Sequence, residues 1–189
     1  MTFAKTSALV CSALLALTLA GCNNANTKPD ADSASTPAPK AYSGPAVTVA
    51  SSVPYDKDSN ATESVRKECA LDTRLPEFIE ESAKSQGVQV VRGTASPHGK
   101  GRVLVMEIVN VHGTAGGAWS GAKSVTIGGK LYDNGKLIGS FTARRMSGGG
   151  AFGGYKSTCA ILGRCVQALG SDVAEFLAKP TMDAKIGDL

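Results

Sequence analysis

Alternating and clustered apolar positions predict about five β-strands along the chain. Residues 46–50 alternate and are rich in β-branched side chains, and residues 88–91 form a second short run. The longest apolar run, residues 103–111, begins with apolar side chains at both parities, which is typical of a central strand covered on both faces. Two more strands are expected at residues 125–132 and 137–141.

The last two of these strands are joined by an Asn-Gly pair, which is the strongest short-range signal for a two-residue β-hairpin. With Asn134 and Gly135 as the loop residues, Leu131 is expected to face Ile138. This register predicts a β-bulge near residues 128–129, where two glycines follow one another.

Two segments have the composition and spacing of helices. Residues 61–87 are helical in character, and Pro76 is expected to divide them, because proline followed by acidic residues is typical of a first helical turn. A final helix is expected from about residue 157 to 179, with Pro180 after it. Its apolar face repeats at three-and-four spacing and consists of Ile161, Leu162, Cys165, Leu169, Val173, Phe176 and Leu177.

The order of elements predicts one α+β domain over residues 46–189. Strand, helix, four strands and helix are expected to form a mostly antiparallel sheet of about five strands, with the helices packed on one face. Residues 22–45 contain almost nothing large and apolar. Because such a segment cannot bury enough surface to offset the entropy of ordering, it is expected to be a flexible tether.

The first 21 residues have the pattern of an export signal. Lys5 precedes an apolar run that ends in small residues and a cysteine at Leu19-Ala20-Gly21-Cys22. A membrane-spanning helix would need about 20 apolar residues, and this run is shorter and interrupted by serine and threonine. An ordinary cleaved signal would not need the cysteine.

These four residues resemble the lipobox of bacterial lipoproteins, in which the cysteine is lipidated and becomes the first mature residue. The resemblance implies that acyl chains such as palmitate on Cys22 anchor the protein to a membrane. Asn23 and Asn24 follow the cysteine and lack the aspartate that marks inner-membrane retention in this class. The expected location is therefore the outer membrane, with the domain facing the periplasm.

Charge and motifs argue against nucleic acids and nucleotides as partners. The formal net charge is +4, and the basic residues are scattered, whereas nucleic-acid binding calls for a clustered patch. Gly148, Gly150 and Gly153 match the letters of the dinucleotide fingerprint, but no strand is apparent after the final helix to complete the βαβ unit. No cofactor is expected.

Three cysteines, Cys69, Cys159 and Cys165, would be in the oxidising periplasm, where a disulfide can persist. Six residues of helix separate the last two by about 9 Å of rise, which is more than the roughly 7 Å limit between bridged Cα atoms. A Cys159–Cys165 bond would therefore require the helix to begin near Cys165. Otherwise Cys69 pairs with one of the two, and Cys69–Cys159 is favoured, with Cys69–Cys165 as the alternative, because Cys165 lies on the apolar face as a buried free thiol would. No metal site is expected, because there is no CxxC motif and the histidines are far from the cysteines in sequence.

Aromatic residues on glycine-rich loops are candidates for a binding surface. Trp119, Phe152 and Tyr155 are of this kind, and Arg145 lies beside the second loop. The alternative is that these rings fold back onto the core. Catalysis is not expected, because there are only two histidines and no serine lies in a G-x-S-x-G elbow.

The order of elements from Val47 to Pro180 is similar to that of small α/β domains of outer-membrane lipoproteins, and no functional residue can be carried over from them. Three functions follow as hypotheses. The first is a non-enzymatic envelope accessory module that binds a protein or a glycan. The second is a structural or assembly lipoprotein that forms an oligomer. The third is a small periplasmic hydrolase or thiol enzyme.

Overall fold

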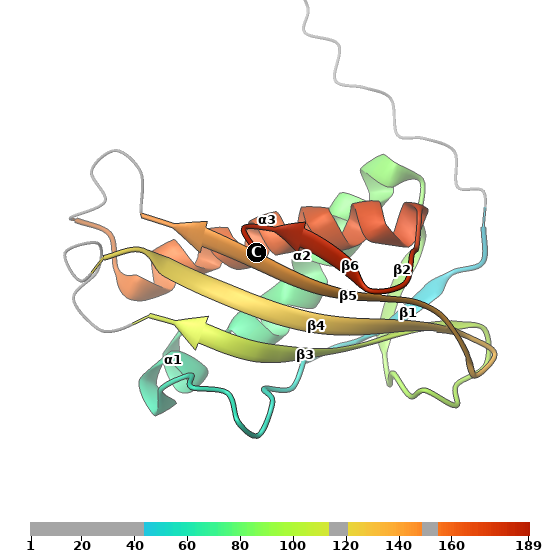
Figure 1. Ribbon diagram of the computed structural model, residues 1–189, viewed down its shortest axis with the longest axis horizontal. Helices are drawn as coiled ribbons and strands as arrows, with labels where there is room; N and C mark the ends of the chain where they lie inside the picture. Colours follow the sequence, from blue (N-terminus) through green and yellow to red (C-terminus); the bar gives the residue numbers. More distant parts are fainter. Residues whose placement is uncertain (1–43, 114–120, 149–154) are drawn as a thin grey trace, which may run out of the picture. The chain divides into compact units, whose positions relative to one another are not determined.

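A six-stranded mixed sheet and three helices make up the part of the chain that the computed structural model describes, residues 44–113, 121–148 and 155–189 (Figure 1). The elements in chain order are β1 (Val47–Ala50), α1 (Glu63–Glu68), α2 (Leu71–Gln86), β2 (Val90–Gly93), β3 (Arg102–His112), β4 (Lys123–Asp133), β5 (Lys136–Ser147), α3 (Thr158–Ala178) and β6 (Ala184–Gly187).

The sheet has the strand order β2-β1-β3-β4-β5-β6. The three long strands β3, β4 and β5 are antiparallel. The short strands extend them on both sides, with β1 parallel to β2 and β3, and β6 parallel to β5. The predicted α+β class is therefore confirmed, and the sheet has one strand, β6, that the sequence pattern did not predict.

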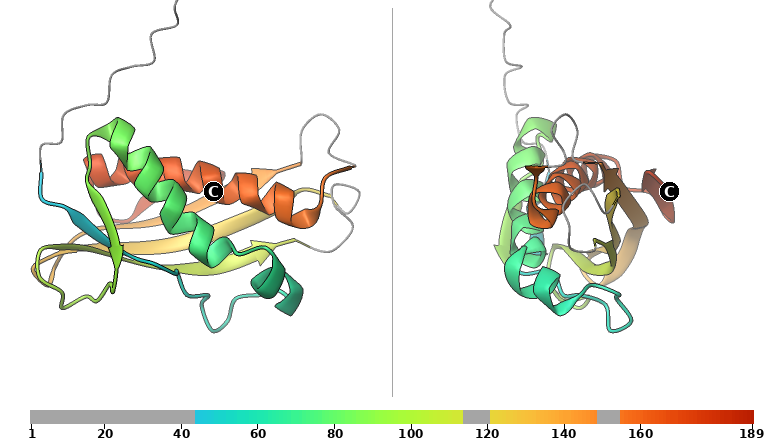
Figure 2. Two further views of the ribbon diagram at one scale, coloured as in Figure 1. Left: turned by 180° about the vertical axis from the view of Figure 1, so that it is seen from behind. Right: turned by 90° about the vertical axis from the view of Figure 1, so that its left-hand side faces the viewer.

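The long helices α2 and α3 pack against each other and cover one face of the sheet (Figure 2). The predicted apolar face of α3 is buried at every position from Ile161 to Leu177 that the spacing selected. Helix α3 begins where its cap predicts, since the Ser157 hydroxyl accepts a hydrogen bond from the Ala160 amide at 3.2 Å. The opposite face of β3, β4 and β5 has no helix over it in the described part of the chain.

The first helical segment divides at Ala70 and not at Pro76, so this prediction was wrong. Ala70 adopts a left-handed conformation (φ 50°) between α1 and α2, and Pro76 lies inside α2. Proline has no amide to donate to the carbonyl four residues earlier, which is that of Asp72. The Val53 amide donates to this carbonyl instead, at 3.0 Å. The missing helical bond is thus replaced by a bond to the chain that follows β1.

The hairpin has the predicted loop, but its bulge lies elsewhere. Asn134 and Gly135 both have positive φ (49° and 83°), as a type I′ turn requires. Leu131 pairs with Gly139, and not with Ile138 as expected, so the extra residue of the bulge is in β5. Side-chain packing explains this register, because a β-carbon on Gly139 would lie 2.9 Å from the ring of Phe176.

The strand β6 completes a unit that the sequence pattern did not show. It pairs in parallel with β5 after α3, so β5, α3 and β6 form a βαβ crossover. The expectation that no strand follows the final helix was therefore wrong. The dinucleotide fingerprint also calls for an acidic residue about 20 positions on. The residue near that distance, Asp172, lies in α3 and is paired with Arg145.

Candidate binding groove

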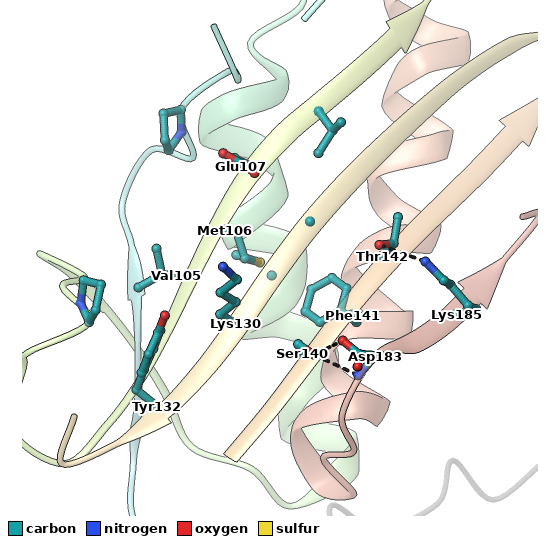
Figure 3. Close-up of a pocket in the computed structure, with 15 residues that line it drawn as sticks. Val105, Met106, Glu107, Lys130, Tyr132, Ser140, Phe141, Thr142, Asp183 and Lys185 are labelled. Carbon is teal, nitrogen blue, oxygen red and sulfur yellow. Dashed lines mark hydrogen bonds between the residues drawn. The ribbon is translucent and has the colours of Figure 1, made fainter. Parts of the chain in front are cut away.

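An open groove of about 600 Å³ lies on the helix-free face of the sheet (Figure 3). Its base is formed by β3, β4 and β5, and the segment around β6 forms one side. The polar and aromatic residues that line it are Glu107, Lys130, Tyr132, Ser140, Phe141, Thr142, Asp183 and Lys185.

A glycine opens the middle of the groove. Gly128 faces Glu107 across the β3–β4 ladder, and a β-carbon added there would lie 3.4 Å from Val109 Cγ2 and 3.8 Å from Glu107 Oε1. These are ordinary contacts, and Gly128 does not have a positive φ. Glycine is therefore not required by the backbone here, and its effect is to leave space between the side chains of β3 and β5.

The β6 side of the groove is held by hydrogen bonds. The Ser140 hydroxyl donates to Asp183 Oδ1 at 2.9 Å and accepts from the Asp183 amide at 2.8 Å. Lys185 Nζ donates to Thr142 Oγ1 at 3.5 Å (Figure 3). The C-terminal segment is thereby attached to β5, and this side of the groove is positioned before any ligand binds.

The β3–β4 side presents unengaged side chains. Glu107 and Lys130 are exposed, and neither forms an ion pair with another described residue. Lys130 lies opposite Val105 in the ladder, and Tyr132 stands beside them at one end of the groove (Figure 3). An acceptor, a donor and an aromatic ring are thus available along one groove, an arrangement suited to binding.

Of the residues that the sequence selected as a binding surface, the two that the structure describes, Tyr155 and Arg145, do not line this groove. Trp119 and Phe152 lie outside the described residues, as does Cys22. Tyr155 is 90% exposed just before α3. The groove itself was missed because Glu107 and Lys130 occupy ordinary outward positions of alternating strands, and only the glycine at 128 marks the place.

Arg145 forms ion pairs with two carboxylates of the same chain. Its guanidinium donates to both carboxylate oxygens of Asp172, from Nε at 2.7 Å and from Nη2 at 2.6 Å. Arg145 Nη1 also lies 3.8 Å from Asp188 Oδ1. The hydrogen bond with Asp172 raises the pKa of Arg145, against the opposing effect of burial. Arg145 therefore links β5 to α3 and to the residue after β6.

The disulfide joins Cys69 and Cys159, the pair that the sequence favoured. It ties the junction of α1 and α2 to the first turn of α3, with 4.8 Å between the two Cα atoms. Cys165 is a buried free thiol, and its Sγ lies 3.6 Å from the Lys123 carbonyl oxygen. Burial raises the pKa of Cys165 to about 11, so this thiol is protonated at neutral pH.

The described residues contain no group of three or more histidine, cysteine, aspartate or glutamate side chains that could hold a metal ion. None of their helices is long and apolar enough to span a membrane.

The chain matches no family model and no curated protein. Among solved structures, it is similar to two dodecameric forms of PelC from Paraburkholderia phytofirmans. One, a variant, is 15% identical with a TM-score of 0.43, and the other is 14% identical with a TM-score of 0.40. Both matches cover 70% of this chain and 92% of PelC.

A minor lipoprotein from Acinetobacter baumannii is also similar. It is 9% identical with a TM-score of 0.36, and the match covers 70% of this chain and 91% of the lipoprotein. A lipoprotein is thus among the similar solved structures. At such low scores and identities, nothing about the activity or partners of these proteins is carried over to this chain.

Proposed function

We propose that this chain is a lipid-anchored outer-membrane accessory protein that binds another component of the cell envelope and does not catalyse a reaction. The observation that carries the proposal is the sequence Leu19-Ala20-Gly21-Cys22 at the end of an apolar export signal. Several acyl chains on Cys22 would hold the protein firmly, since each buried CH₂ contributes roughly 0.8 kcal/mol.

The chemistry of the cysteines supports this proposal. The Cys69–Cys159 disulfide suits an oxidising compartment. A thiol enzyme needs an accessible thiolate, whereas Cys165 is buried and has a raised pKa. The open groove and the exposed ring of Tyr155 offer surfaces for a partner.

Photo-crosslinking in intact cells tests this proposal. A photoreactive amino acid at position 155 is expected to give a discrete adduct with an envelope component, because this aromatic side chain is 90% exposed. The same probe at Val91, which is 47% exposed on the edge strand β2, is the control and should not give that adduct.

The anchor distinguishes the possible outcomes. If partner binding depends on attachment to the membrane, the adduct from position 155 disappears in a Cys22→Ala variant. A ladder of multiples of the chain itself would favour the alternative of an assembly lipoprotein. The absence of any adduct from a correctly lipidated protein would contradict the proposed binding function.

A further inference from the structure

We propose that the groove over Gly128 binds an uncharged segment of a glycan chain. This inference rests on the proposed function, because it assigns a site and a ligand class to the envelope binding proposed above. It depends on the paired main chain beneath the groove, the balance of charged side chains around it, and the aromatic ring at one end.

The main chain beneath the groove is already paired. Strand β4 forms ladders with β3 on one side and with β5 on the other. An extended peptide that adds to a sheet needs free amides and carbonyls at an edge strand, and the centre of this sheet does not offer them. Recognition in this groove must therefore come from side chains, which favours a ligand with polar groups spread around its own surface.

The charges around the groove balance. Lys130 and Lys185 are opposed by Glu107 and Asp183, so a ligand with a large net charge of either sign meets like charges as well as opposite ones. The same side chains provide both donors and acceptors. Sugar hydroxyls donate and accept hydrogen bonds, and they can therefore be recognised by Lys130 and by Glu107 in one complex.

The shape and the aromatic ring also suit a sugar. Tyr132 lies at one end of the groove and brings an apolar ring with a polar tip to it (Figure 3). The C–H bonds on one side of a pyranose ring can pack on such a face. The absence of a side chain at Gly128 leaves room for the ring to approach the sheet, and the groove volume of about 600 Å³ is in the range of ligand sites.

Isothermal titration calorimetry with chitotetraose tests this inference. The full chain is kept in a polyoxyethylene detergent, which has no sugar headgroup. The wild type is expected to bind saturably. Gly128→Gln, which fills the groove from a position where a β-carbon makes only ordinary contacts, and Tyr132→Ala, which removes the ring, are each expected to weaken binding by about ten-fold or more.

The matched control is Thr126→Gln. Thr126 lies two residues from Gly128 on the same strand, so it faces the same side of the sheet, and it does not line the groove. It should change the affinity by less than about two-fold. Far-ultraviolet circular dichroism of each variant verifies that it is folded, and the two groove variants act through different residues, so one remains informative if the other unfolds.

Three results would overturn the inference. These are no binding of chitotetraose by the folded wild type, binding that Gly128→Gln and Tyr132→Ala leave unchanged, or competition by trialanine, which would assign the groove to a peptide. Any of them, together with an envelope adduct from position 155, would leave the proposed function in place. Chitotetraose binding without such an adduct would support the groove and contradict the wider proposal.

Discussion

Replacing both cysteines of the disulfide, Cys69→Ala with Cys159→Ala, is expected to lower the free energy of unfolding by about 2–4 kcal/mol. The bond closes a loop with a sequence separation of 90, so removing it frees a large part of the unfolded chain. In the folded state it joins the α1–α2 junction to the start of α3. Urea unfolding followed by circular dichroism measures the loss.

Reduction supplies the control for this variant. A reductant should destabilise the wild type by a similar amount and leave the double variant unchanged, because Cys165 forms no disulfide in the described structure. A double variant as stable as the wild type would contradict a stabilising role for the bond. A double variant that still responds to reductant would show that the reductant does not act through the Cys69–Cys159 bond.

Gly170→Ala is expected to destabilise the protein by about 2 kcal/mol, because α2 and α3 approach closely at this residue. A β-carbon on Gly170 would lie 2.5 Å from the Phe78 β-carbon and 2.9 Å from the Phe78 carbonyl carbon. These atoms belong to the backbone of α2 or are bonded directly to it, so relief requires the helices to separate. Urea unfolding of the variant gives the free energy directly.

Gly163→Ala on the same helix is the matched control. A β-carbon there would lie 2.7 Å from Arg74 Nη1, at the end of a flexible and partly exposed side chain that can move aside. Alanine also favours a helix interior over glycine by roughly 1 kcal/mol. Gly163→Ala should therefore be neutral or stabilising. Equal stabilities for the two variants would contradict the close approach of α2 and α3 at Gly170.

The sequence was sufficient where local signals and periodicity agree. The long run that became β3, the Asn134-Gly135 turn and the apolar face of α3 each combine a repeated pattern with a clear boundary residue. Such elements are specified by residues close to one another in the chain, so the α+β class could be predicted from them.

The elements that the sequence missed depend on distant contacts. Strand β6 has only four residues, and their exposure alternates. It forms because it pairs with β5, from which α3 separates it in the sequence. The bulge lies in β5 because the ring of Phe176 requires Gly139 beneath it. Pro76 remains inside α2 because Val53 uses the carbonyl that proline leaves free.

The candidate groove could not be predicted for the same reason. Gly128 was noted only as a place for a bulge, and nothing near it in sequence shows that Asp183 bonds to Ser140 and completes one side. By contrast, the resemblance of residues 19–22 to a lipobox needs the sequence alone, because export signals are recognised as linear motifs. The proposed anchor and the proposed groove therefore come from different kinds of observation.

Labelling with radioactive palmitate, followed by separation of inner and outer membranes, tests the central claim most directly. The wild type and a Cys11→Ser control, which changes a cysteine within the apolar run, should be labelled and fractionate with the outer membrane. Cys22→Ser should be unlabelled, and Asn23→Asp should be labelled but retained in the inner membrane. Label on Cys22→Ser, or none on the wild type, would contradict the lipid anchor at Cys22.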